Sequence, residues 1–133
     1  IAIWRQVWEV IRERPLFGSG PDTLSLWGKG FTGYDRTVQA QITTIIDAAH
    51  NEYLNIWANQ GIIALAAYLT ALAALAAEWV KNGVRDTQIT ICGCSVLCYC
   101  IQAFFGMSSC MTAPYFWMLL GMLSYRNRQS KRI

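Results

Sequence analysis

Hydrophobic and polar residues are distributed unevenly along the chain, which has a polar first half and an apolar second half. Residues 61–80 carry one charged side chain, Glu78, and residues 87–107 carry none. About 20 apolar residues are needed to cross the ~30 Å hydrocarbon core of a bilayer. A third apolar segment, residues 110–125, is shorter. The pattern therefore predicts three transmembrane helices, at about residues 61–80, 87–107 and 110–125.

The segment before the apolar half has a different pattern. Apolar residues recur at helical spacing through residues 1–14, with charged residues on the opposite face, which predicts an amphipathic helix that ends at Pro15. Its tryptophans, Trp4 and Trp8, suit a membrane interface, and burial against the rest of the protein explains the pattern equally well. Residues 25–46 are polar and of low periodicity, which predicts a loop.

Composition supports a membrane protein. Of the 133 residues, 54% are hydrophobic and 14% are charged, whereas soluble domains carry about 25% charged residues. Basic residues in short loops favour the cytoplasm, and they occur at Lys81, at Arg85 and in the tail after the third predicted helix. We therefore expect an extracytoplasmic segment, residues 1–60, and a membrane segment, residues 61–133, with a cytoplasmic C-terminus.

The beginning of the chain bears on its completeness. It starts at Ile1 and shows no signal peptide or other targeting segment. Three spans make a poor polytopic protein by themselves, so the favoured interpretation is the C-terminal part of a longer membrane protein. A small three-span protein is the alternative.

The five cysteines lie close together in the sequence and raise the question of a metal site. On a helix that advances about 100° per residue, the four cysteines of "CGCSVLCYC" point in different directions, so they do not converge on one ion. We expect them to act as small packing residues between membrane helices. No metal, cofactor or nucleic-acid partner is expected.

The stretch "DAAHNEYLNIWANQG" contains the only histidine of the chain, His50. Asp47 can cap a helix that begins near Ala48, and Glu52 adds negative charge to its first turns. His50 would then lie about three residues into the helix, where the helix dipole favours a neutral imidazole that can accept a proton. His50 is therefore a candidate general base, although a lone histidine at a helix start is often structural.

A second motif, "PLFGSGPDTL", combines proline and glycine in a tight turn. Gly18 and Gly20 would let the backbone approach a partner closely. As a phosphate-binding motif the turn is weak, because no strand precedes it and the lysine of a P-loop is missing.

Read together, "ERPLFGSGPDTL", "DAAHNEYLNIWANQGIIALAAYL" and "APYFWMLLGML" resemble the C-terminal half of the O-antigen ligase and polysaccharide polymerase family of bacterial membrane glycosyltransferases. In that family a "PxxGxGxxxF"-like turn opens an extracytoplasmic loop, an "HNxYL" helix closes it, and a "GxxGL"-like transmembrane helix follows. The resemblance implies an all-α membrane protein, here the C-terminal fragment of a polytopic GT-C-type helical bundle with about three transmembrane helices and an extracytoplasmic loop.

The resemblance also implies an activity: metal-independent transfer of a glycan from an undecaprenyl diphosphate donor to an acceptor hydroxyl at the outer side of the bacterial inner (cell) membrane. The acceptor would be a glycan, a lipid or a protein, in the assembly of O-antigen, capsule or exopolysaccharide. By the same resemblance His50 is the catalytic residue that activates or positions this hydroxyl, and arginines hold the donor diphosphate. The substrate-binding candidates are Arg36, Arg5, Asn51, Tyr53, Gly18 and Gly20.

Departures from the family pattern leave alternatives open. An arginine usually found shortly before the tryptophan that Trp4 resembles would fall upstream of Ile1, so the donor site is incomplete and this fragment is not expected to be active alone. Ligase, polymerase and protein O-glycosylating enzyme are not distinguished. A non-catalytic small membrane subunit or an inactive truncated remnant is the non-enzymatic alternative. A transporter is disfavoured, because Glu78 is the one charge within the predicted spans.

Overall fold

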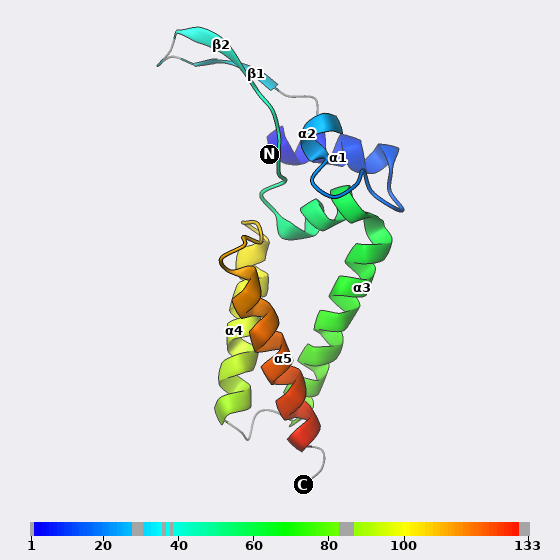
Figure 1. The fold of residues 1–133 in the computed structure, drawn as a ribbon, viewed down its shortest axis with the longest axis vertical. Coiled ribbons are helices and arrows are strands. Elements are labelled where there is room, and N and C mark those ends of the chain that lie inside the picture. The colour runs from blue at the N-terminus through cyan, green and yellow to red at the C-terminus, as the bar shows by residue number, and fades with distance from the viewer. Residues whose placement is uncertain (1, 28–30, 36, 38, 83–86, 131–133) are drawn as a thin grey trace. The chain divides into compact units, whose positions relative to one another are not determined.

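The structure, a computed structural model, describes residues 2–27, 31–35, 37, 39–82 and 87–130 (Figure 1). Its elements are α1 (Ala2–Glu13), α2 (Leu24–Trp27), β1 (Phe31–Asp35), β2 (Ala40–Thr44), α3 (Glu52–Asn82), α4 (Thr87–Ala103) and α5 (Ala113–Ser130). Helices make up most of the described chain, which confirms the helical fold class. The chain divides into two compact units, unit 1 (Ile1–Leu65) and unit 2 (Ala66–Ile133).

Unit 1 is built around the apolar face of α1. Val7, Val10 and Ile11 are buried there, and residues from the later parts of unit 1 cover them. The predicted amphipathic helix is confirmed, and these three side chains are buried against protein. The other residues of this small core are Leu24, Ile46, Ala49 and Ala58, with Ile3, Leu54 and Trp57 packed against them.

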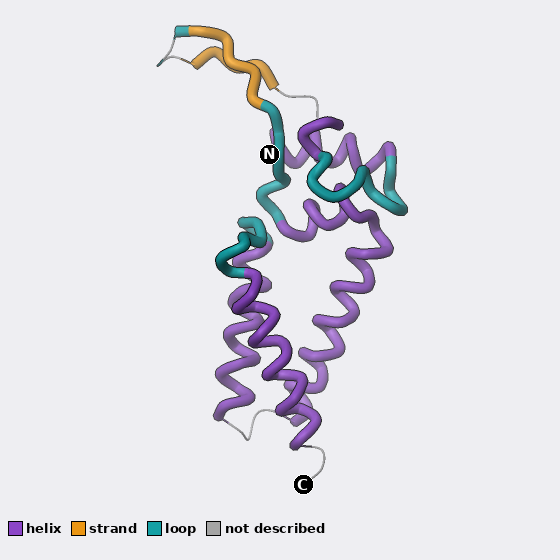
Figure 2. The backbone as a smooth tube through the Cα atoms, viewed as in Figure 1, coloured by secondary structure: helices purple, strands orange, loops and turns teal. Residues whose placement is uncertain are grey.

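The segment predicted as a loop, residues 25–46, contains regular structure, so that prediction is wrong for much of it. Strands β1 and β2 form an antiparallel hairpin in which Phe31 pairs with Thr44 and Asp35 pairs with Ala40 (Figure 2). The short helix α2 precedes the hairpin. A hairpin is held by backbone hydrogen bonds between its strands and does not need the alternation of apolar residues that marks a half-buried strand.

Helix α3 begins in unit 1 and continues into unit 2, and it is kinked at Gly61, where φ is 87° and ψ is 173°. Among the described residues, α3 is the one helix that is long and apolar enough to cross a membrane, over Glu52–Lys81. Helix α4 is apolar but shorter, with 17 residues. The third predicted span is helical from Ala113. The number of spans and the sidedness of residues 1–60 stay predictions.

Unit 2 is held together by apolar packing between helices. Phe116 of α5 stacks on Tyr99 of α4, with ring centroids 4.1 Å apart. Gly93 of α4 lies against the indole ring of Trp79 of α3, and a side chain at this position would clash with that ring. The buried core consists of Ile89, Cys92, Val96, Phe116, Leu120 and Leu123. Cys92 is the one cysteine in this core, and all five cysteines are free thiols.

Candidate functional site

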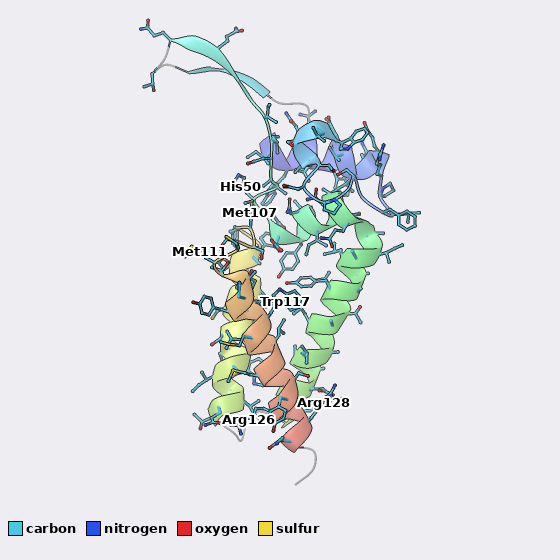
Figure 3. The ribbon with its side chains drawn as sticks, viewed as in Figure 1. His50, Met107, Met111, Trp117, Arg126 and Arg128 are labelled. Carbon is cyan, nitrogen blue, oxygen red and sulfur yellow. The ribbon has the colours of Figure 1, made fainter. Side chains whose placement is uncertain are left out.

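His50 lies immediately before helix α3 and not inside it (Figure 3). The residue that caps the helix is Asn51, whose side-chain Oδ1 accepts a hydrogen bond from the backbone N–H of Leu54 at 3.0 Å. Its carbonyl oxygen accepts the N–H of Asn55 at 2.9 Å, as the first helical bond. The predicted start near Ala48, with Asp47 as the cap, is therefore wrong.

The late start of α3 has a tertiary cause. Ile46 and Ala49 are buried in the core against α1, and both backbone groups of Ala49 are engaged. Its carbonyl accepts the indole N–H of Trp4 at 3.0 Å, and its N–H donates to Oδ1 of Asn55 at 3.4 Å. A helical turn beginning near Ala48 would remove these contacts. The argument that His50 lies within the first turn of the helix therefore does not hold.

The backbone of His50 adopts the left-handed conformation, with φ of 49°. For a residue other than glycine this conformation costs roughly 1–2 kcal/mol, and it persists only where the surroundings impose it. The two neighbours supply that constraint, since Ala49 is 0% and Asn51 is 2% exposed. The side chain of His50 itself is exposed. An accessible imidazole is thus carried on a backbone that is held on both sides.

Three asparagines at four-residue spacing continue this support along α3. The side-chain amide of Asn59 donates to the backbone carbonyl of Asn55 at 3.0 Å and to its Oδ1 at 3.2 Å. Oδ1 of Asn55 also accepts the N–H of Ala49, so it links the helix to the segment before His50. Sequence reasoning missed Asn55 and Asn59. Their recurrence after Asn51 at helical spacing in "NEYLNIWANQ" was the signal that could have found them.

The glycine-rich turn binds the kink in α3. In an unbroken helix the carbonyl of Ala58 would accept the N–H of Ile62. Here it accepts the backbone N–H of Ser19 at 2.8 Å and the Ser19 hydroxyl at 3.0 Å. The freed N–H of Ile62 donates to the carbonyl of Pro15 at 3.0 Å. The turn therefore satisfies the backbone groups that the kink at Gly61 leaves without helical partners.

The expected close approach of the glycines is observed, and the partner is α3. Gly20 donates its N–H to the carbonyl of Asn59 at 2.9 Å. Gly18 has φ of 70°, and a Cβ added there would lie 2.5 Å from the backbone of Asn59. A Cβ on Gly61 would collide with the carbonyl of Leu16. Both turn glycines thus allow the turn to pack against α3. A contact between these glycines and a substrate stays a prediction.

Two of the remaining candidates, Arg5 and Tyr53, lie among the described residues, and the third does not. Arg5 is exposed on α1 and directly follows Trp4, which binds the residue before His50. Tyr53 is half-buried in the first turn of α3. Arg36, the first candidate for the donor diphosphate, lies outside the described residues. Within the described part of the chain, no group of three or more His, Cys, Asp or Glu side chains could hold a metal ion.

A family model described as O-antigen ligase matches residues 1–69, which cover all of unit 1 and slightly more than half of the chain. The chain belongs to the O-antigen ligase family. Comparisons with curated proteins and with solved structures return no match. The match confirms the resemblance carried by the glycine-rich turn and the "HNEYL" motif, both of which lie inside it.

Membership in the O-antigen ligase family gives the function at a coarse level. It indicates a membrane-associated glycosyltransferase-type enzyme of surface polysaccharide assembly, with a lipid-linked glycan and an acceptor as its partners. The apolar helix α3 agrees with a membrane location. The region that the family model covers is also the region that contains His50, the glycine-rich turn and the kink at Gly61.

Proposed function

We propose that this chain takes part in transferring a glycan from an undecaprenyl-diphosphate-linked donor to an acceptor hydroxyl. The reaction would occur at the outer side of the bacterial inner (cell) membrane, within a multi-pass GT-C-type helical bundle whose C-terminus is cytoplasmic. The products would be surface polysaccharides such as O-antigen, capsule or exopolysaccharide. In this proposal His50 is the general base and acts directly on the acceptor.

The observation that carries the proposal is that the His50 side chain is exposed on a backbone whose two neighbouring residues are buried. Its ring is exposed while Ala49 and Asn51 beside it are buried, so an acceptor can reach the imidazole without distorting the backbone. A hydroxyl is a poor nucleophile, and a base within hydrogen-bond reach of its proton accelerates attack. A fixed backbone keeps that base in position from one turnover to the next.

The proposed chemistry is a substitution at the anomeric carbon of the donor glycan. The acceptor oxygen forms a bond to this carbon as the bond to the diphosphate oxygen breaks, and the leaving diphosphate takes the electron pair. The imidazole of His50 accepts the proton of the acceptor hydroxyl. Guanidinium groups stabilise the negative charge that develops on the diphosphate, and Arg36 and Arg5 are the candidates for this role.

The other candidates receive supporting roles in this proposal. Oδ1 of Asn51 accepts the N–H of Leu54, which fixes Asn51 on helix α3 and in this way positions His50 directly before it. Tyr53, in the first turn of α3, remains a candidate for contact with a sugar. Gly18 and Gly20 hold the glycine-rich turn against α3 near Asn59. They therefore support unit 1 at the kink, whereas Asn51 supports it at the start of α3.

The test is to replace His50 by asparagine in the full-length protein. Asparagine is one of the residues that adopt the left-handed conformation most readily, so His50→Asn removes the base and retains the backbone. The protein is expressed in a host that lacks the equivalent enzyme, and surface glycan is followed by gel profile. Gln39→Asn is the matched control, because Gln39 is exposed and also has a positive φ, 51°.

We expect His50→Asn to lose nearly all surface glycan at unchanged abundance in the membrane, while Gln39→Asn keeps it. The lipid-linked sugar that accumulates then separates the activities: single repeat units indicate a polymerase, and finished polymer indicates a ligase. Loss of a sugar from a protein acceptor indicates O-glycosylation. Unchanged glycan in His50→Asn would overturn the proposal and favour a non-catalytic subunit or an inactive remnant.

A further inference from the structure

The glycine-rich turn exposes two large apolar side chains that its hydrogen bonds do not explain. Leu16 is 55% and Phe17 is 77% exposed. We call this pair the apolar turn. Keeping a leucine or phenylalanine side chain in water instead of burying it costs about 1.5–3 kcal/mol.

The apolar turn is fixed to α3 at a defined level of the helix. The carbonyl of Pro15 accepts the backbone N–H of Ile62 at 3.0 Å and the indole N–H of Trp57 at 3.1 Å. The backbone of Leu16 and Phe17 packs against Gly61 so closely that a Cβ on this glycine would collide with it. The two exposed side chains therefore cannot move along α3 independently of the kink.

Gly61, to which the apolar turn is fixed, also marks the boundary between the polar and apolar parts of α3. Before Gly61 the helix carries Glu52, Asn55, Asn59 and Gln60, and residues 62–77 contain no charged or amide side chain. When such a helix crosses a bilayer, the hydrocarbon region begins near Gly61. At a rise of 1.5 Å per residue, the apolar turn lies within about one helical turn, ~5 Å, of that boundary.

Aromatic and basic residues near the turn fit the same environment. Trp57, whose indole binds the carbonyl of Pro15, lies one turn before Gly61. The guanidinium of Arg14, next to Pro15, lies 4.1 Å from the ring centroid of Trp27. Tryptophan is enriched where a membrane meets water, and arginine binds the phosphate groups found there.

We propose that the apolar turn is a membrane-interface anchor, in which Leu16 and Phe17 insert between the headgroups and acyl chains of the bilayer that α3 crosses. Because the turn is bonded to the kink of α3, the anchor would set the height of unit 1, and with it of His50, at the bilayer surface. The proposal depends on α3 crossing the membrane and is independent of the chemical role of His50.

The test measures the depth of position 17 in the lipid. The full-length protein, in a cysteine-free background, carries Phe17→Cys labelled with a nitroxide and is reconstituted in vesicles of phosphatidylethanolamine and phosphatidylglycerol. Electron paramagnetic resonance then compares collisions with oxygen, which concentrates in lipid, and with a water-soluble nickel chelate. Gln41→Cys, at an exposed position of β2, is the aqueous reference, and Ile63→Cys, exposed on α3 after the kink, is the lipid reference.

We expect the oxygen-to-nickel ratio at position 17 to be several-fold higher than at position 41 and close to that at position 63, with Leu16→Cys behaving in the same way. A ratio at position 17 equal to that at position 41 would place the turn in water and overturn the anchor. Low accessibility to both reagents would show that another protein segment covers the turn, and a water-like ratio at position 63 would show that α3 does not cross. Either result also overturns the proposal.

Discussion

The two units of the chain are stabilised by different kinds of interaction. In unit 1, hydrogen bonds join segments far apart in the sequence, for example from the indole of Trp4 to the carbonyl of Ala49 and from the N–H of Ser19 to the carbonyl of Ala58. In unit 2, the described contacts between helices are mainly those of apolar side chains, such as Tyr99 stacked on Phe116.

The candidate site lies in the unit whose distant segments are joined by hydrogen bonds. Hydrogen bonds are directional, so they fix particular backbone atoms and hold His50 in a conformation that it would not adopt alone. Apolar packing is non-directional and tolerates exchanges of similar volume. Unit 2 is therefore held by packing that does not fix single backbone atoms, whereas unit 1 fixes the backbone on both sides of His50.

The largest expected effect comes from Gly61→Ala, which tests whether the junction between turn and helix holds unit 1 together. The φ and ψ at Gly61 belong to a region that glycine alone adopts, and the added methyl group would collide with the Leu16 carbonyl. Backbone strain and overpacking together should lower the free energy of unfolding by roughly 3 kcal/mol or more. Thermal unfolding in detergent and proteolysis of the turn at residues 15–20 measure the effect.

Gly121→Ala is the control for this substitution, because nothing lies within 4 Å of the position where its Cβ would be. In the helix α5 this change should leave stability unchanged or raise it by up to about 1 kcal/mol. Equal behaviour of the two variants would show that docking of the turn contributes nothing to unit 1.

The sequence predicted the features of unit 1 that depend on local pattern. The spacing of apolar residues revealed the helix at residues 1–14, and the density of glycine and proline revealed a turn with a close backbone approach. The partner of that approach could not be read locally, since α3 lies some forty residues further on, as the 39-residue separation of Ser19 and Ala58 shows.

The start of α3 shows the same limit. Asp47 and Asn51 are both favourable N-caps, and the choice between them is decided by the burial of Ile46 and Ala49 against α1. That packing brings together residues distant in sequence, so local propensity did not reveal it. The hairpin of β1 and β2 was missed because backbone pairing leaves little apolar pattern. For Arg36 the predicted role stays a prediction.

A smaller effect, confined to unit 2, is expected for Gly93→Ala. The added Cβ would meet the ring of Trp79, and the ring is a side chain that can shift where a backbone atom cannot. We expect overpacking to lower the free energy of unfolding by about 1–3 kcal/mol. Proteolysis of the turn at residues 15–20 should not change, and accelerated cleavage there would contradict the separation of the two units. Gly121→Ala again serves as the control.

The smallest effect on stability, and the one most informative about the site, is expected for Asn51→Ala. Loss of the cap on the N–H of Leu54 should cost about 1 kcal/mol, too little to unfold unit 1. Because this cap fixes Asn51, the residue directly after His50, the variant should still lose surface glycan at normal abundance. Asn51→Ser, which restores a capping oxygen, should recover much of it. If both variants keep full activity, His50 does not need a backbone fixed at this position. The directional bonds of unit 1 would then serve stability alone.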